Sequence, residues 1–251
     1  MTIRNLFVAM AGTVTLLGAA LRPALADSQP LPVLMVIANQ DFYYREYADT
    51  RASLQSQGVQ VVVAAGTTQL AIPHGRNPRV QPNRAISDVD AADYSAIVFV
   101  GGWGSSMYQY AFEGTYNHVA YRPDPIVART VNELINDFVI QDKYVAAISH
   151  GVSVLAYARV DGVSPIAGRV VTAWAGGGPG FKLDGEIFPD VAVATRWHIE
   201  KNGGSMPLSA SAGDPLSVAD DVIVDGKIIT AENFNSARLF GQTIAAMVGT
   251  Q

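Results

Sequence analysis

The chain has 251 residues, of which 49% are hydrophobic and 16% are charged. This composition excludes a disordered chain, which has few apolar residues and a high net charge, and a coiled coil, which is rich in charged helix formers. The net charge is −5 and no segment concentrates Lys or Arg, so the sequence offers nucleic acid no electrostatic footprint. The absence of cysteine excludes disulfides, thiolate metal ligands and a cysteine nucleophile.

Residues 1–26 have the pattern of a secretory signal peptide. Arg4 supplies the positive charge, the run 6–21 is apolar and uncharged, and Ala24-Leu25-Ala26 is a small-x-small cleavage site. The run is shorter than the roughly 20 residues of a spanning helix, and an uncleaved anchor helix is the alternative. We therefore expect an exported protein, periplasmic or secreted, with one domain over 27–251 and no membrane contact after cleavage.

The remaining chain alternates predicted strands and helices. Continuous apolar runs predict strands buried on both faces, and apolar positions at helical spacing predict helices. Asp225-Gly226 suits the two-residue turn of a hairpin. In the first half of the chain we expect a strand over 32–39, a helix over 44–57, a strand over 59–65, a long connection over 66–90 with a short strand as an option, a strand over 96–100 and an aromatic excursion over 103–125. In the second half we expect a helix over 125–141, a strand over 144–148, a helix from 149 to about 160, candidate strands over 170–175 and 191–194, a hairpin over 222–230 and a helix over 235–248.

Repeated strand–helix units imply an α/β fold in which a mostly parallel sheet is sandwiched by helices, a flavodoxin-like three-layer arrangement. In such sheets ligands bind beyond the carboxyl ends of the strands. Three of these ends carry polar residues or glycine, namely Asn39-Gln40-Asp41, Gly101-Gly102-Trp103 and Ser149-His150-Gly151. We expect a pocket for a small molecule where they meet.

The segment Ser149-His150-Gly151 has the layout of a nucleophile elbow, because a buried strand leads directly into x-Ser-x-Gly and a helix. The tight turn exposes the side chain, and the helix N-terminus offers N–H groups to a developing oxyanion. Gly151 allows the helix to approach the strand closely. Ala147 stands where the stricter motif has glycine, and a helix-capping serine is the alternative interpretation.

The stretch AAISHGVSVLA, residues 146–156, resembles the elbow of the ThiJ/PfpI superfamily, which has the class I glutamine amidotransferase-like fold. The family pattern there is strand, Ala-x-Cys-His-Gly, helix. Segments 33–41, 90–102 and 222–233 resemble the family's first strand with its acidic turn, its strand into Gly-Gly and its C-terminal hairpin, and Ser236-Ala237 resembles its last helix. The family includes glyoxalase- and deglycase-like enzymes, peptidase-like proteins, isonitrile hydratases and chaperone-like proteins.

The resemblance implies a role for each matching position. Ser149 takes the place of the nucleophile, His150 that of its base, and the Gly101-Gly102 turn contributes an oxyanion N–H. The family's acid beside the nucleophile corresponds to Asp41, with Gln40 as the other alignment. Serine stands where the family has cysteine, and a serine hydroxyl, unlike a thiol, needs a general base within hydrogen-bond reach.

Further residues are candidates for the pocket. Tyr43 and Trp103 lie close to two of the strand ends, although Tyr43 is also explained as half-buried packing. Asp184 or Glu186 is a candidate to orient His150. The aromatic excursion 103–125 is interpreted as a lid or, slightly favoured, a subunit contact.

Neither a metal nor a cofactor is expected. Only His198-x-Glu200 has local ligand spacing, on the assumption that this segment is a strand. The run Gly176–Gly180 lacks the Lys-Ser/Thr of a phosphate loop, and no Gly-x-Gly-x-x-Gly follows the first strand.

Two functions are consistent with these residues. The first is an enzyme, a hydrolase, hydratase or glyoxalase-like protein, that acts on small carbonyl or acyl compounds at Ser149. The second is a non-catalytic binding or chaperone-like, stress-related module that has lost the family thiol. The resemblance also implies a homodimer.

Overall fold

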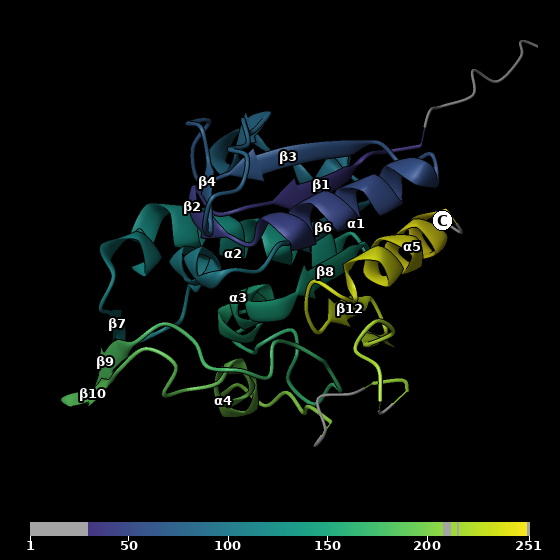
Figure 1. Cartoon of the computed structure of the whole chain (residues 1–251). Helices are drawn as coiled ribbons and strands as arrows, with labels where there is room; N and C mark the ends of the chain where they lie inside the picture. Colours follow the sequence, from purple (N-terminus) through teal and green to yellow (C-terminus); the bar gives the residue numbers. More distant parts are fainter. Residues whose placement is uncertain (1–29, 208–211, 215, 250–251) are drawn as a thin grey trace, which may run out of the picture.

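The computed structural model describes residues 30–207, 212–214 and 216–249, so the predicted signal peptide lies outside the described residues. At its centre is a seven-stranded sheet of order β11-β12-β8-β6-β1-β3-β5 (Figure 1). Every neighbouring pair in it is parallel except β11–β12. The strands are β1 (Val33–Val36), β3 (Val61–Ala65), β5 (Arg84–Ala85), β6 (Ala96–Phe99), β8 (Tyr144–Ile148), β11 (Val222–Asp225) and β12 (Ile228–Ala231).

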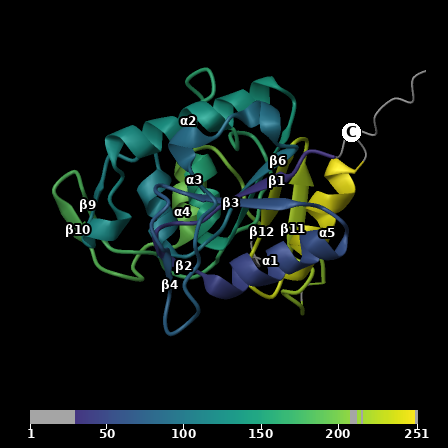
Figure 2. The same ribbon diagram turned by 90° about the horizontal axis from the view of Figure 1, so that it is seen from above.

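Helices cover both faces of this sheet. In Figure 2, α1 and α5 lie on one side of the strands and α2 lies on the other. α1 packs against α5, α5 contacts β8 and β12, and α2 contacts β6 and β8. The expected three-layer α/β fold is therefore confirmed. The helices are α1 (Tyr44–Ser56), α2 (Pro125–Ile140), α3 (Val152–Tyr157), α4 (Thr195–Lys201) and α5 (Ala237–Val248).

The sequence patterns that predicted these elements have clear physical causes. All residues of β1, β6 and β8 are buried, as continuous apolar runs require. The α2 helix begins where predicted because Asp124 caps it: Oδ1 accepts the N–H groups of Ile126 and Val127 at 2.9 and 3.1 Å, and Pro125 occupies the first turn. Across the described ranges, no helix combines the length and apolar character of a membrane span.

Two predicted strands are wrong. Residues 170–175 form a single bridge, from Val170 to Ser205, and residues 191–194 also form only one bridge. Val191 has a φ of 63°, in the left-handed region, which breaks the extended conformation a strand needs. The helix after 149 is also shorter than expected: a 3-10 helix, η5 (Ser149–Gly151), precedes α3, which ends at Tyr157.

Short strands build two smaller sheets. The sequence did not predict these sheets, although it left room for a short strand within 66–90, where β4 lies. β2 directly follows β1 in the chain and pairs in parallel with β4, which follows β3. This small sheet lies close to the expected pocket. β7, β9 and β10 form an antiparallel sheet, and the β9–β10 hairpin projects away from the central sheet (Figure 1). These strands are β2 (Gln40–Phe42), β4 (Ile72–Pro73), β7 (Thr115–Tyr116), β9 (Phe181–Leu183) and β10 (Glu186–Phe188).

Part of the aromatic excursion belongs to the core. Tyr108 and Tyr116 are buried, with exposures of 2% and 0%. The Tyr108 hydroxyl donates to the carbonyl of Ile37, and the Tyr116 hydroxyl donates to Gln109.

The predicted C-terminal hairpin, β11–β12, is present, with Asp225 paired to Ile228. Its turn therefore lies one residue later than expected.

Candidate active site

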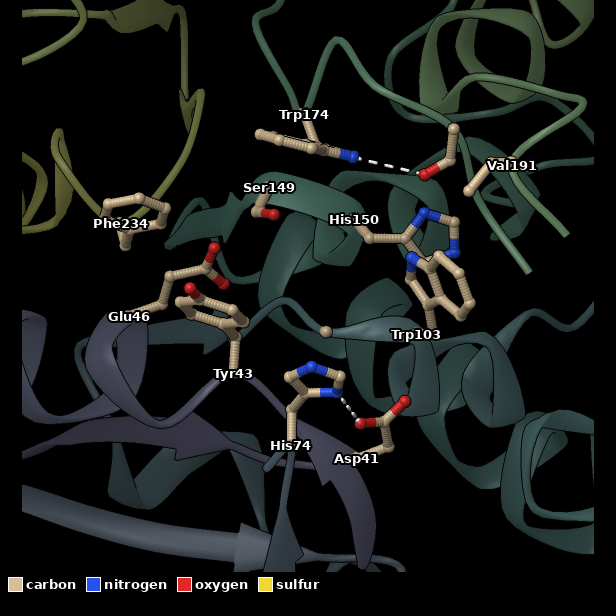
Figure 3. A pocket seen from close by; sticks show the side chains of 12 residues that line it. Asp41, Tyr43, Glu46, His74, Trp103, Ser149, His150, Trp174, Val191 and Phe234 are labelled. Carbon is tan, nitrogen blue, oxygen red and sulfur yellow. Dashed lines mark hydrogen bonds and ion pairs between the residues drawn. The ribbon is translucent and has the colours of Figure 1, made fainter. Parts of the chain in front are cut away.

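A cavity of about 350 Å³ lies at the carboxyl ends of β6 and β8 (Figure 3). It brings together Asp41, Gly102 and Ser149, one residue from each of the three strand ends that the sequence singled out. Its walls are largely aromatic. Tyr43 and Trp103 lie next to the strand ends, and His74, Trp174 and Phe234 come from three other parts of the chain. The full set of lining residues is Asp41, Tyr43, Glu46, His74, Gly102, Trp103, Ser149, His150, Trp174, Gly177, Val191 and Phe234.

Ser149 occupies a strained position between β8 and η5. Its φ is 59°, in the left-handed region, which costs a non-glycine residue on the order of 1–3 kcal/mol. Its side chain lines the cavity while the residue stays 94% buried, since its exposure is only 6%. This backbone geometry is that of the predicted elbow, and it turns the hydroxyl toward the cavity (Figure 3).

The acid beside Ser149 is Glu46, in the first turn of α1. It is 2% exposed, and burial raises the pKa of its carboxyl from 4.5 to about 8, so the neutral form predominates at pH 7. The Ser149 hydroxyl and the Gly101 N–H face this carboxyl and lower the pKa in part. Neither makes a hydrogen bond of full geometry to Oε2, which is buried without a partner.

The sequence analysis overlooked Glu46 and assigned its place to Asp41. The sequence carried no clear signal for it: Glu46, Thr50 and Ser53 follow one face of the helix at helical spacing, and the structure shows that all three are buried. The hydroxyls of Thr50 and Ser53 donate to carbonyls at the start of α5. In a sequence a polar face of this kind predicts the solvent-exposed side of a helix, and only the structure shows that it is turned toward hydrogen-bonding partners.

Gly101 makes the close approach of Glu46 and Ser149 sterically feasible. A Cβ atom built at this position would lie 2.4 Å from Glu46 Oε2 and 2.7 Å from Ser149 Cβ. Gly102 has a φ of 93°, which favours glycine, and Gly151 lies close to strand β6, where a Cβ would come within 2.7 Å of the Phe99 carbonyl oxygen. Gly102 therefore lines the cavity, and Gly101 and Gly151 allow the close packing behind it.

His150 does not contact Ser149 through its ring. Nε2 lies 2.9 Å from the Ser106 hydroxyl and Nδ1 lies 2.9 Å from the Thr195 hydroxyl, so both nitrogens are engaged. The ring is buried, which lowers its pKa from 6.5 to about 4 and keeps it neutral at pH 7. The expected role of base for Ser149 lacks the necessary contact, and Thr195 takes the orienting place given to Asp184 or Glu186.

Asp41 also has partners other than Ser149. Its Oδ1 lies 2.7 Å from His74 Nδ1, and its Oδ2 accepts the Tyr121 hydroxyl at 2.5 Å. Asp41 has a φ of 57° and lines the cavity beside Gly102. The sequence placed this acid correctly at the pocket but paired it with the wrong residue.

Two further candidates lie outside the cavity lining. Gln40 is exposed on β2, and Asp184 lies in the turn of the projecting β9–β10 hairpin. Tyr43 and Trp103 do line the cavity. His74, Trp174 and Phe234 complete it from loops whose sequence carried no signal for a pocket.

The sequence analysis considered His198 and Glu200 as metal ligands on the assumption that their segment is a strand, and this assumption is wrong. His198 and Glu200 lie on helix α4 rather than on a strand, so two residues apart they do not share a face. His198 is fully buried among aromatic rings and its Nδ1 contacts the Tyr157 hydroxyl at 2.9 Å. In the part of the chain that the structure describes, no three His, Cys, Asp or Glu residues form a group suited to a metal ion.

Comparisons with known proteins agree with the architecture. Over 88% of its length, the chain superposes on 97% of a ThiJ/PfpI domain protein from Brachyspira murdochii, with a TM-score of 0.63 and 20% identity. It similarly matches 96% of glyoxalase III from Candida albicans over 86% of its own length, with a TM-score of 0.60 and 16% identity. The chain has the ThiJ/PfpI fold.

At the level of sequence the ThiJ/PfpI fold is less easily seen. No family model matches the chain. An uncharacterized protein of Methanocaldococcus jannaschii is 29% identical over 211 residues, which cover 83% of this chain and 78% of that protein. This relative carries no functional description.

Proposed function

We propose that the chain is an enzyme of the ThiJ/PfpI superfamily that binds a small carbonyl or acyl compound at Ser149 and promotes addition of water to it. The observation that carries this proposal is the pair of Ser149 and a neutral, buried Glu46 at the floor of the cavity. A hydroxyl and a protonated carboxyl can both donate to one carbonyl oxygen. Such donors stabilise the negative charge that develops on this oxygen when a nucleophile attacks.

The position of Glu46 at the cavity beside Ser149 supports a bound ligand at this point. A ligand carbonyl that accepts a hydrogen bond from this carboxyl would offset part of the cost of burying it. The cavity of about 350 Å³ lies at the lower end of small-molecule sites. Its aromatic walls would cover the apolar part of a compound of a few carbon atoms.

Ser149 acts in this proposal as a hydrogen-bond donor rather than as a nucleophile. A serine nucleophile needs a base that accepts its proton, but Glu46 is neutral at pH 7 and both His150 nitrogens are engaged by other hydroxyls. We therefore expect a fluorophosphonate probe to leave the protein unmodified. A single adduct that is absent in Ser149→Ala would instead support a covalent hydrolase.

The lack of a base in contact with Ser149 also favours a second candidate function, a non-catalytic binding or chaperone-like module. The two candidates differ in turnover. We would measure hydrolysis of p-nitrophenyl acetate by absorbance and conversion of methylglyoxal by proton NMR, with binding of each followed by the fluorescence of Trp103 and Trp174, which line the cavity.

For the enzyme, Ser149→Ala and Glu46→Leu should each lower turnover of the accepted probe at least about 100-fold, because each removes one oxyanion donor. Ser87→Ala and Glu133→Leu, both exposed and outside the cavity, are the matched controls and should stay within about twofold. Binding without turnover, lost in Ser149→Ala, would favour the binding module. Full turnover in Ser149→Ala would contradict both candidates.

Export and self-association are separate proposals. We propose that residues 1–26 are removed on export to a periplasm or to the medium, on the strength of the sequence pattern alone. Intact mass of the protein recovered from the exported fraction tests this, and a mass that includes residues 1–26 would contradict it. A homodimer, proposed from the resemblance, is tested by sedimentation equilibrium.

A further inference from the structure

A second polar centre faces the cavity opposite Ser149. His74 Nδ1 lies 2.7 Å from Asp41 Oδ1, and the Tyr121 hydroxyl donates to Asp41 Oδ2 at 2.5 Å. The Asp41 side chain is only 19% exposed, whereas the His74 side chain is 67% exposed. The carboxylate is thus fixed on both oxygens, and the imidazole that it holds is accessible to solutes entering the cavity.

The fold positions this pair through the small β2–β4 sheet. Gln40 and Phe42 of β2 pair with Ile72 and Pro73 of β4, and Asp41 is the extra residue between these two pairs, next to the end of β4 from which His74 follows. The His74 N–H donates to the Phe42 carbonyl at 2.8 Å.

An aromatic stack continues from His74 along the same wall. The Tyr43 ring stacks on His74 at 6.2 Å and on Phe234 at 5.4 Å, with interplanar angles of 17° and 19°. His74 is therefore held at its backbone, at Nδ1 and on one face of its ring.

The contact with Asp41 selects one tautomer of the imidazole. A carboxylate oxygen only accepts hydrogen bonds, so Nδ1 carries the proton and Nε2 has a free lone pair when the ring is neutral. Figure 3 shows Nε2 turned toward the interior of the cavity, on the side of Ser149. Burial and the bond to Asp41 raise the pKa of Tyr121, so its hydroxyl remains a donor and keeps Asp41 in place.

We propose that His74 is the acid–base residue of this cavity and that Asp41 and Tyr121 are its positioning residues. This inference rests on the proposed function and deepens it. With an acyl compound, Nε2 takes a proton from water as the water oxygen bonds to the acyl carbon and the carbonyl π electrons move to the oxygen held by Ser149 and Glu46. The bond to the leaving group then breaks, the carbonyl re-forms, and the imidazolium returns the proton to the leaving group, so that one water is consumed.

The test compares turnover of p-nitrophenyl acetate and methylglyoxal in the full protein and its variants. His74→Ala should lower kcat for the accepted probe at least about 100-fold with KM changed less than about threefold, because general base catalysis contributes 10²–10⁴-fold. Added imidazole should restore at least a tenth of the lost rate, since the vacated site is open to solvent. Asp41→Asn should lower kcat about tenfold.

Glu133→Ala is the control, because Glu133 is also exposed, lies on α2 and does not line the cavity. It should stay within about twofold of the native protein and show no imidazole effect. Native turnover in His74→Ala together with a loss in Ser149→Ala would overturn the role of His74 and leave the proposed function standing. If the native protein turns over neither probe, both the role of His74 and the proposed enzymatic function are overturned.

Discussion

The carboxyl of Glu46 faces the hydroxyl of Ser149 although the two residues are far apart in the sequence. Glu46 lies in the first turn of α1, and Ser149 directly follows β8. Gly101 brings them together because it has no side chain to separate them. The pair is buried, and burial keeps Glu46 protonated at pH 7. The site therefore offers two neutral donors rather than a charged nucleophile and its base.

Glu46→Gln should change how stability depends on pH. Folding raises the pKa of Glu46 from 4.5 to about 8, so its contribution to the free energy of unfolding is fully present below about pH 4.5 and is lost as the pH rises through about 8. Urea unfolding at pH 5, 7 and 9 should show a decline in the native protein that Glu46→Gln reduces.

Glu232 supplies the internal comparison for that measurement. Burial and the neighbouring Asp221 raise its pKa to about 8 as well, so part of the decline should persist in Glu46→Gln and be removed only when Glu232→Gln is added. A native slope that survives in the double variant would show that other groups determine the alkaline loss of stability.

His150→Leu should destabilise the protein by about 1–3 kcal/mol, because it leaves the buried hydroxyls of Ser106 and Thr195 without their partner. Folding lowers the pKa of His150 from 6.5 to about 4. Its contribution is thus present above about pH 6.5 and is lost as the pH falls through about 4. Unfolding followed by circular dichroism at pH 7 and pH 5 should show a smaller acid-induced loss in the variant. Equal losses in both proteins would contradict this assignment.

Gly101→Ala should destabilise the protein by about 1–3 kcal/mol and weaken binding of the probes. The added Cβ would meet Glu46 Oε2 at 2.4 Å and the Ile148 carbonyl at 2.8 Å, and neither neighbour can withdraw without opening the site. Gly249→Ala, at the end of α5 with a φ of −74° and the nearest neighbour of the added Cβ at 3.2 Å, controls for the change of residue type. Differential scanning calorimetry measures the stability of both variants, and the fluorescence of Trp103 and Trp174 measures their binding of the probes. A Gly101→Ala protein as stable as the control would mean that the site adjusts freely.

Ser149→Cys should provide a single reactive thiol, because the chain contains no cysteine. Iodoacetamide should add one carbamidomethyl group, seen by intact mass. Ser153→Cys should stay unmodified in the folded protein, since Ser153 is fully buried and does not line the cavity. Equal labelling of both variants would contradict the assigned accessibility. Turnover of methylglyoxal only in Ser149→Cys would favour a module that has lost its catalytic group.

Much of the framework follows from local sequence. The apolar runs of β1, β6 and β8, the cap at Asp124 and the strand–Ser–helix junction at Ser149 each depend on residues that are neighbours in the chain. From them the parallel sheet, its three layers and the edge that carries the cavity could be predicted. The exceptions, such as the missing strand around Val191, arise where a left-handed residue interrupts an apolar run.

The sequence by itself determined which strand ends form the site, because the carboxyl ends of parallel strands meet at one edge of the sheet. Only the tertiary structure decided which side chains touch there: Glu46 with Ser149, His150 with Thr195, and Asp41 with His74. These contacts join residues of different elements. Hydrophobic periodicity fixes the face that an element buries, but the rotation and depth at which helices and loops pack on the sheet decide which polar groups meet.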